Sequence, residues 1–233
     1  MNWSTLDELW SQRHDPAQLS ALEKALDQSL TESGAAAEYG LLWRYARLAH
    51  FRAMQADANA TKGEAYHHFA RGAQRARQAV RLQWYGVEGN FWYGVNLIEA
   101  ARRHPLEMLY CCPAWRALSI ATWHIERAAS IDETYHFAGP LRVWGRLTHL
   151  RPLLLGGSVE RAIVLYRRAL QIAPDNSTTL LYYAEALLAD KQQRAAREVL
   201  KRIIEASDDP DWRWEQERDR GLAQALLESI KSA

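Results

Sequence analysis

Residues that could do chemistry occur in this chain only in small groups. Glu64 and His68 are four positions apart and would share a helix face, but two ligands do not make a metal site. Cys111 and Cys112 are adjacent, a spacing that rarely forms a disulfide and is more typical of small buried hydrophobic residues. The chain has no phosphate-binding glycine loop, G-x-S-x-G or H-E-x-x-H motif. We therefore expect no metal, no cofactor and no enzymatic activity, with a thiol enzyme or hydrolase as the least favoured alternative.

A second group is cationic. Arg142, Arg146 and His149 would share one face of a helix. Such a stripe needs carboxylates, an anionic ligand or water beside it. Glu88 or Glu99 would supply the carboxylates if the helices that carry them stack side by side, which would give a salt bridge between repeats. The alternative is that the arginine forks bind an anion or a peptide carboxylate, and the sequence leaves both open.

The elements that must position these residues are helical. Hydrophobic residues make up 48% of the 233 residues, and strand signals are nearly absent. Apolar residues recur at i, i+3, i+4 and i+7, and Pro and Gly separate the segments. This pattern predicts helices at 16–31, 36–56, 61–83, 88–103, 114–130, 139–150, 158–173, 177–190, 193–206 and 214–231. The net charge of +1 argues against a nucleic-acid-binding protein.

The helices also repeat in pairs. Ala162, Tyr166, Ala169 and Pro174 occupy the small, aromatic, small and proline positions of a tetratricopeptide second helix, and Ala195 follows Ala162 by nearly the roughly 34-residue period of that repeat. We predict a single all-α domain over 1–233, a right-handed α-solenoid of tetratricopeptide-like helical hairpins. It would comprise an N-terminal helical extension over 1–35, repeats over 36–206 and a capping helix over 207–233. Trp212, Trp214, Leu222, Leu226 and Leu227 would cover the open end of the stack.

The segment "EGNFWYGVNLIEAARR", residues 88–103, is predicted to be the first helix of a pair. Phe91, Val95 and Ile98 form an apolar face, and Gly94 would allow a close helix approach. First helices line the concave face of such superhelices, so we expect a groove that binds a peptide or protein. Its residues would be Glu88, Trp92, Asn96, Tyr135, Arg142, Arg146 and Tyr182. If Trp92 is buried, its face is core and the functional site lies elsewhere.

Four stretches give the chain a family resemblance. They are residues 88–103, Ile131–Leu170, the "APDN" boundary at 173–176 and "DPDWRWEQERDRGLAQALL" at 209–227. With these stretches the chain resembles the tetratricopeptide-type T-component proteins of tripartite ATP-independent periplasmic (TRAP) transporters. The resemblance implies a superhelix without catalytic activity that assists a substrate-binding protein. Oligomers with a ligand-accessible channel are a further expectation.

Localisation is where the chain departs from that family, whose members are usually exported. The N-terminus has no basic or apolar region of a signal peptide, and no apolar run is long enough to span a membrane. We expect a cytoplasmic protein as the sequence is written, and a periplasmic one if an export signal was removed. The expected partner is a protein or peptide, such as a solute-binding protein. The alternative is a cytoplasmic peptide-binding adaptor for the assembly of complexes.

Overall fold

The computed structural model describes residues 3–32, 35–59, 61–103 and 114–231. These residues are all-α, and no strand occurs among them. The chain divides into two compact units, unit 1 over Met1–Asp132 and unit 2 over Glu133–Ala233. The boundary falls inside the predicted repeat region 36–206. A single domain, a right-handed solenoid and tetratricopeptide geometry therefore stay predictions.

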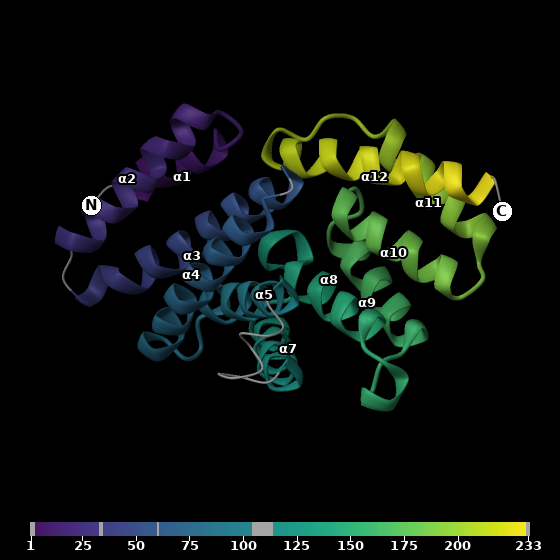
Figure 1. Ribbon diagram of the computed structural model, residues 1–233, viewed down its shortest axis with the longest axis horizontal. Helices are drawn as coiled ribbons and strands as arrows, with labels where there is room; N and C mark the ends of the chain where they lie inside the picture. The colour runs from purple at the N-terminus through teal and green to yellow at the C-terminus, as the bar shows by residue number, and fades with distance from the viewer. Residues whose placement is uncertain (1–2, 33–34, 60, 104–113, 232–233) are drawn as a thin grey trace. The chain divides into compact units, whose positions relative to one another are not determined.

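Unit 1 consists of helices that pack in chain order (Figure 1). They are α1 (Trp3–Ser11), α2 (Pro16–Glu32), α3 (Ala35–Ala58), α4 (Lys62–Leu82), α5 (Val87–Arg103) and α7 (Ala114–Ile131). Helix α5 packs against α4 and α7 and also touches α3. The contacts with α4, α7 and α3 together cover more than one face of α5. This explains why most of α5 is buried.

Small residues set the helix spacing in unit 1. A Cβ at Gly94 would lie 2.7 Å from Ile125 Cγ1 and 3.0 Å from the backbone oxygen of Ala121. Helices α5 and α7 therefore approach to a distance that only glycine permits, which confirms the role predicted for Gly94. Phe91, Val95 and Ile98 are buried, as the predicted core face requires. Helix α1, which the sequence pattern did not predict, buries Leu6.

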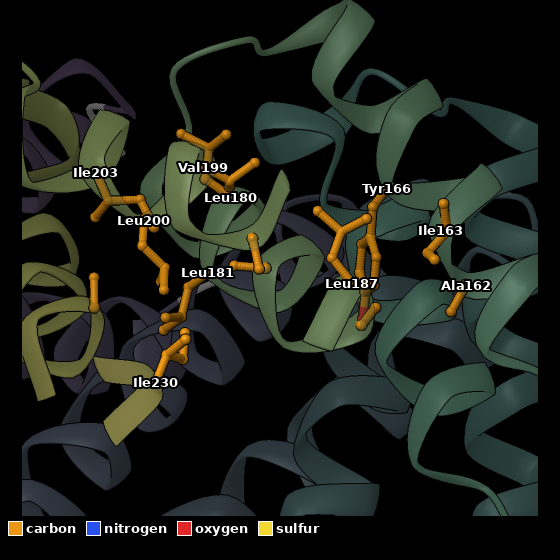
Figure 2. Close-up of a cluster of buried hydrophobic side chains, with 14 residues drawn as sticks. Ala162, Ile163, Tyr166, Leu180, Leu181, Leu187, Val199, Leu200, Ile203 and Ile230 are labelled. Carbon is orange, nitrogen blue, oxygen red and sulfur yellow. The ribbon is translucent and has the colours of Figure 1, made fainter. Parts of the chain in front are cut away.

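Unit 2 begins with α8 (Tyr135–Leu150) and the short 3-10 turn η1 (Leu153–Leu155), and α9 (Val159–Ile172), α10 (Ser177–Ala189), α11 (Gln193–Glu205), η2 (Pro210–Trp212) and α12 (Arg213–Lys231) follow. Its core is an aliphatic cluster around Tyr166, drawn in Figure 2. Ala162, Tyr166 and Ala169 are fully buried. Ser158 and Asn176 cap α9 and α10 by accepting backbone N–H bonds.

Helix α12 packs on α10 and α11. Trp212 is buried in front of it, and Leu226 and Leu227 are partly buried against the core. Leu222 is 50% exposed, so its predicted place in the cover was wrong. The side of α12 that reaches the core carries Ala223, Leu226, Leu227 and Ile230, and Leu222 lies outside it.

The start of α8 is irregular. His136, Phe137 and Ala138 have φ values of 52°, 56° and 55°, a left-handed turn that costs about 1 kcal/mol per residue for side chains with a Cβ. Regular helix then starts at Gly139, where the sequence predicted it, with Pro140 in the first turn.

Candidate binding surface

Two of the predicted groove residues in unit 1 lie in its core. Trp92 is 3% exposed and Asn96 is fully buried. The Asn96 side-chain amide donates to the backbone oxygens of Trp92 at 2.8 Å and Ala46 at 3.2 Å. The Trp92 ring lies 5.5 Å from that of His50 on α3. Neither residue faces an open surface.

Glu88, the third groove residue predicted in unit 1, is half-buried. Its carboxylate accepts a 2.8 Å hydrogen bond from the Tyr39 hydroxyl. Glu99 instead accepts from Arg102 at 3.1 Å and forms an ion pair with Arg103. Both carboxylates thus have partners inside unit 1.

Arg142, the first residue of the predicted cationic stripe, is 5% exposed. Its guanidinium donates to the backbone oxygen of Phe137 at 2.9 Å and to Asn176 Oδ1 at 3.3 Å, and lies 5.4 Å from the Trp212 ring. Burial lowers the pKa of Arg142 to about 10, which leaves it charged at neutral pH. Through its hydrogen bond to the backbone oxygen of Phe137, the buried Arg142 side chain stabilises the left-handed turn at residues 136–138.

Arg146 and Tyr182 come together in unit 2. Arg146 forms an ion pair with Glu185 of α10, and its guanidinium lies 4.3 Å from the Tyr182 ring. This is a salt bridge between helices, as one sequence interpretation had it, but with a carboxylate that the sequence did not single out. Tyr135 is half-buried, and its ring lies 5.9 Å from that of His136.

A buried carboxylate joins α12 to the start of α10. Asp219 is fully buried and accepts from Ser177 Oγ at 2.8 Å, Thr178 Oγ1 at 2.6 Å and Arg218 Nε at 2.9 Å. Its lone pairs are occupied by these donors, so its role is to hold the two helices together.

The exposed side chains best suited to binding lie in unit 1, at positions that the sequence analysis did not single out. Trp84 and Tyr85 in the α4–α5 turn are 47% and 73% exposed, and Trp123 of α7 is 42% exposed. The Arg127 guanidinium lies 4.9, 4.5 and 5.5 Å from these three rings, and the two indoles are 5.1 Å apart. We call these four residues the aromatic–arginine surface.

The turn beneath this surface is held by Asn90. Its amide donates to the backbone oxygens of Trp84 at 3.0 Å and Gly86 at 2.8 Å. A Cβ at Gly86 would collide with Tyr39, so the turn needs glycine there. The rings are thus presented on a fixed backbone.

His124 connects this support to α7. Since the Asn90 amide donates twice, its Oδ1 accepts, and His124 Nδ1, 2.7 Å away, must carry the proton. Burial, and then the charge of Arg127, lowers the pKa of His124 to about 4. The imidazole is therefore neutral at physiological pH, and the hydrogen bond that fixes the turn persists there.

The adjacent aromatic pair Trp84-Tyr85 before a glycine was the signal available in the sequence. Neither the breaker pattern nor helix periodicity reveals that a turn and a helix far apart in the chain share a surface.

The arrangement suits binding more than chemistry. The described residues contain no cluster of three or more metal-ligating side chains. His68 Nε2 lies 3.7 Å from Glu64 Oε1. Burial lowers the pKa of His68 below its ordinary value. Cys111 and Cys112 lie outside the residues described. No helix in the described ranges combines the length and apolar character needed to cross a membrane.

Comparison with known proteins gives the family. No curated protein matched the chain. The family model of the TRAP transporter T-component matches residues 15–231, which include α2 to α12. The chain therefore belongs to the TRAP transporter T-component family.

Proposed function

We propose that this protein is a non-catalytic binding component of a TRAP transporter, and that it holds a partner protein on the aromatic–arginine surface. The observation that carries the proposal is the exposure of Trp84, Tyr85 and Trp123 around one guanidinium. Trp, Tyr and Arg are the residues most enriched among those that dominate binding energy at protein interfaces. Family membership supplies the transporter context.

The chemistry of the surface describes the partner. Arg116 and Arg127 lie on one face of α7 with Trp123, and Arg81 is exposed just before Trp84. A complementary patch would carry carboxylates beside apolar groups, because the guanidinium recognises the former and the rings bury the latter. Among transporter subunits, the solute-binding protein is the partner we propose.

The test is binding of the purified chain to a solute-binding protein of a TRAP transporter from the same organism, measured by interferometry. We expect Trp84→Ala with Trp123→Ala to weaken binding by about tenfold or more, which corresponds to about 1.4 kcal/mol.

Trp3→Ala is the matched control. Trp3 is an indole of unit 1 that is 36% exposed, with the Arg44 guanidinium 4.6 Å from its ring. It should leave binding unchanged. Equal affinity of the double variant and the unmutated chain would exclude this surface, and lack of binding by the unmutated chain would exclude the partner.

The second candidate is a peptide-binding adaptor that uses Tyr135, Arg146 and Tyr182 of unit 2. The contact between Arg146 and Tyr182 favours it. A charge reversal at Arg142 is unsuitable as a test because that side chain is buried. Arg146→Gln, with circular dichroism as a control of folding, should abolish capture of a carboxylate-ended peptide library if the adaptor function holds.

A further inference from the structure

The connection between α8 and α9 places three consecutive leucines in solvent. Leu153 is 81% exposed, Leu154 98% and Leu155 58%, and Leu150 at the end of α8 is 50% exposed. We call these four residues the leucine tip. In Figure 1 the connection extends beyond the ends of both helices. Exposed apolar residues in such a run usually mark an interaction site.

Backbone hydrogen bonds hold the leucine tip in this arrangement. The backbone oxygen of Pro152 accepts from Leu155 N at 2.9 Å and Gly157 N at 3.1 Å, and Thr148 O accepts from Ser158 N at 3.1 Å. Gly156 has a φ of 86°, which favours glycine. The turn is closed by its own backbone, so the leucine side chains point outward from a defined structure.

The shape and composition of the tip describe what it contacts. Its side chains project from a convex turn, and a convex turn offers no enclosed site for a small molecule. The leucines carry no hydrogen-bonding group, and leucine is under-represented among residues that dominate protein interfaces. In this the tip differs from the aromatic–arginine surface, which has the composition of a protein interface.

The charges beside the tip are nearly balanced. Arg161 and Glu160 are both exposed in the first turn of α9, and residues 150–157 contain one arginine and no acidic residue. An occupant recognised through strong charge complementarity therefore does not fit. A layer of aliphatic chains does, since it requires burial of apolar surface and little else.

We propose that the leucine tip inserts into the apolar boundary of a lipid bilayer and holds unit 2 at the membrane surface. Three leucine side chains carry roughly twelve apolar carbons, close to one myristoyl chain, which alone gives reversible binding with a constant of about 10⁴ M⁻¹. The tip is thus a weak anchor that acts together with a second contact. Membership of a transporter family places a membrane within the protein's setting.

The experiment is sedimentation of the purified chain with vesicles of phosphatidylcholine, and with vesicles of three parts phosphatidylcholine to one part phosphatidylglycerol. We expect binding to both, with little dependence on salt. The affinity of the triple variant Leu153→Ser, Leu154→Ser and Leu155→Ser for the vesicles should be lower by about tenfold or more. It should remain folded by circular dichroism because the three side chains are exposed in the folded chain.

Two controls test whether any exposed apolar residue suffices. Val164→Ser on α9, 63% exposed, and Leu222→Ser on α12, 50% exposed, should leave vesicle binding unchanged. Absence of binding by the unmutated chain, or equal binding by the triple variant, would overturn the proposal. The proposal would also be overturned if the chain bound only to the vesicles that contain phosphatidylglycerol and salt abolished this binding.

The vesicle assay contains no partner protein, so its failure is distinct from failure of the proposed function. If vesicles do not bind but the triple variant loses affinity for the solute-binding protein, the tip is a protein contact and the lipid proposal is wrong.

Discussion

The two units differ in the polar side chains that they bury completely, since those of unit 1 are neutral amides and those of unit 2 include a carboxylate. In unit 1 the fully buried amides of Asn90 and Asn96 donate to backbone oxygens, and Asn90 also pairs with the neutral ring of His124. In unit 2 the buried groups include the cation Arg142 and the carboxylate of Asp219. Unit 1 also has ion pairs between helices, such as Arg103 with Asp57, but these are partly exposed, whereas the carboxylate of Asp219 in unit 2 is fully buried.

This difference has an energetic consequence. A neutral amide that loses its partner costs about 1–3 kcal/mol, whereas a buried charge that loses its partner costs about 3–5 kcal/mol. Loss of the fully buried Asp219 in unit 2 should therefore cost more than loss of Asn90 or Asn96 in unit 1, although buried charges add little net stability when intact.

The largest effect is expected from Asp219→Ala, which leaves Arg218 and two hydroxyls without their common acceptor. The free energy of unfolding should fall by about 3–5 kcal/mol, measured by urea denaturation with circular dichroism. Glu198→Ala removes an exposed ion pair with Lys201 on α11 and should change it by less than about 0.5 kcal/mol. A loss below about 1 kcal/mol for Asp219→Ala would contradict the comparison.

Next come Gly94→Ala in unit 1 and Gly145→Ala in unit 2. A Cβ at Gly145 would lie 2.6 Å from Cε1 of the fully buried Tyr166, much as one at Gly94 would meet Ile125. Each substitution should destabilise by about 1–3 kcal/mol, because neither neighbour has room to move. The two units should be alike in this respect when unfolding is measured in urea. A clear difference would mean that packing as well as charge separates them.

His124 gives unit 1 a dependence on pH. Its pKa is about 4 in the folded chain against 6.5 ordinarily, so between these values the unfolded chain binds a proton that the folded chain does not. Stability should fall as pH drops from about 6.5 to 4, by at most about 1.4 kcal/mol per pH unit, and should not change through His124 above this range.

His124→Asn keeps a donor near Asn90 and should lose this part of the slope. His68 and His149, whose pKa values burial also lowers, remain in both proteins. The difference between the pH dependence of the variant's stability and that of the unmutated chain, both from urea denaturation, is therefore the contribution of His124. Parallel pH profiles would show that His124 is not the neutral partner of Asn90.

The smallest effect is a gain. Gly221 lies inside α12, and a Cβ there would meet nothing within 4 Å. Gly221→Ala should stabilise by about 0.4–1 kcal/mol, because alanine restricts the unfolded chain and favours helix. A rise in the thermal midpoint would check it. A fall would indicate that α12 packs more tightly than its contacts show.

Much of the fold could be predicted from the sequence because its signals are local. Apolar spacing and the breakers at Pro140, Pro174 and Pro210 gave nearly every helix its position. The family resemblance, confirmed over residues 15–231, rested on stretches of the same kind. Helix α1 was missed because its only buried side chain is Leu6, which leaves no periodic apolar face to detect.

The candidate site was less predictable. Trp84 and Trp92 occur in neighbouring aromatic stretches, yet the first is 47% exposed and the second 3%. Their surroundings differ because α5 is covered by α3, α4 and α7, whereas Trp84 lies in the turn before it. A helical period shows which residues share a face but not which helix will cover that face.

By itself, the sequence determined the described helices from α2 to α12, the close approach at Gly94 and the family. The tertiary structure alone decided that Arg146 pairs with Glu185, that Arg142 is buried under Trp212, and that a turn and α7 form one aromatic surface. The physical reason is that helix formation depends on neighbours within a few residues. Burial and ion pairing depend on side chains brought together from distant parts of the chain.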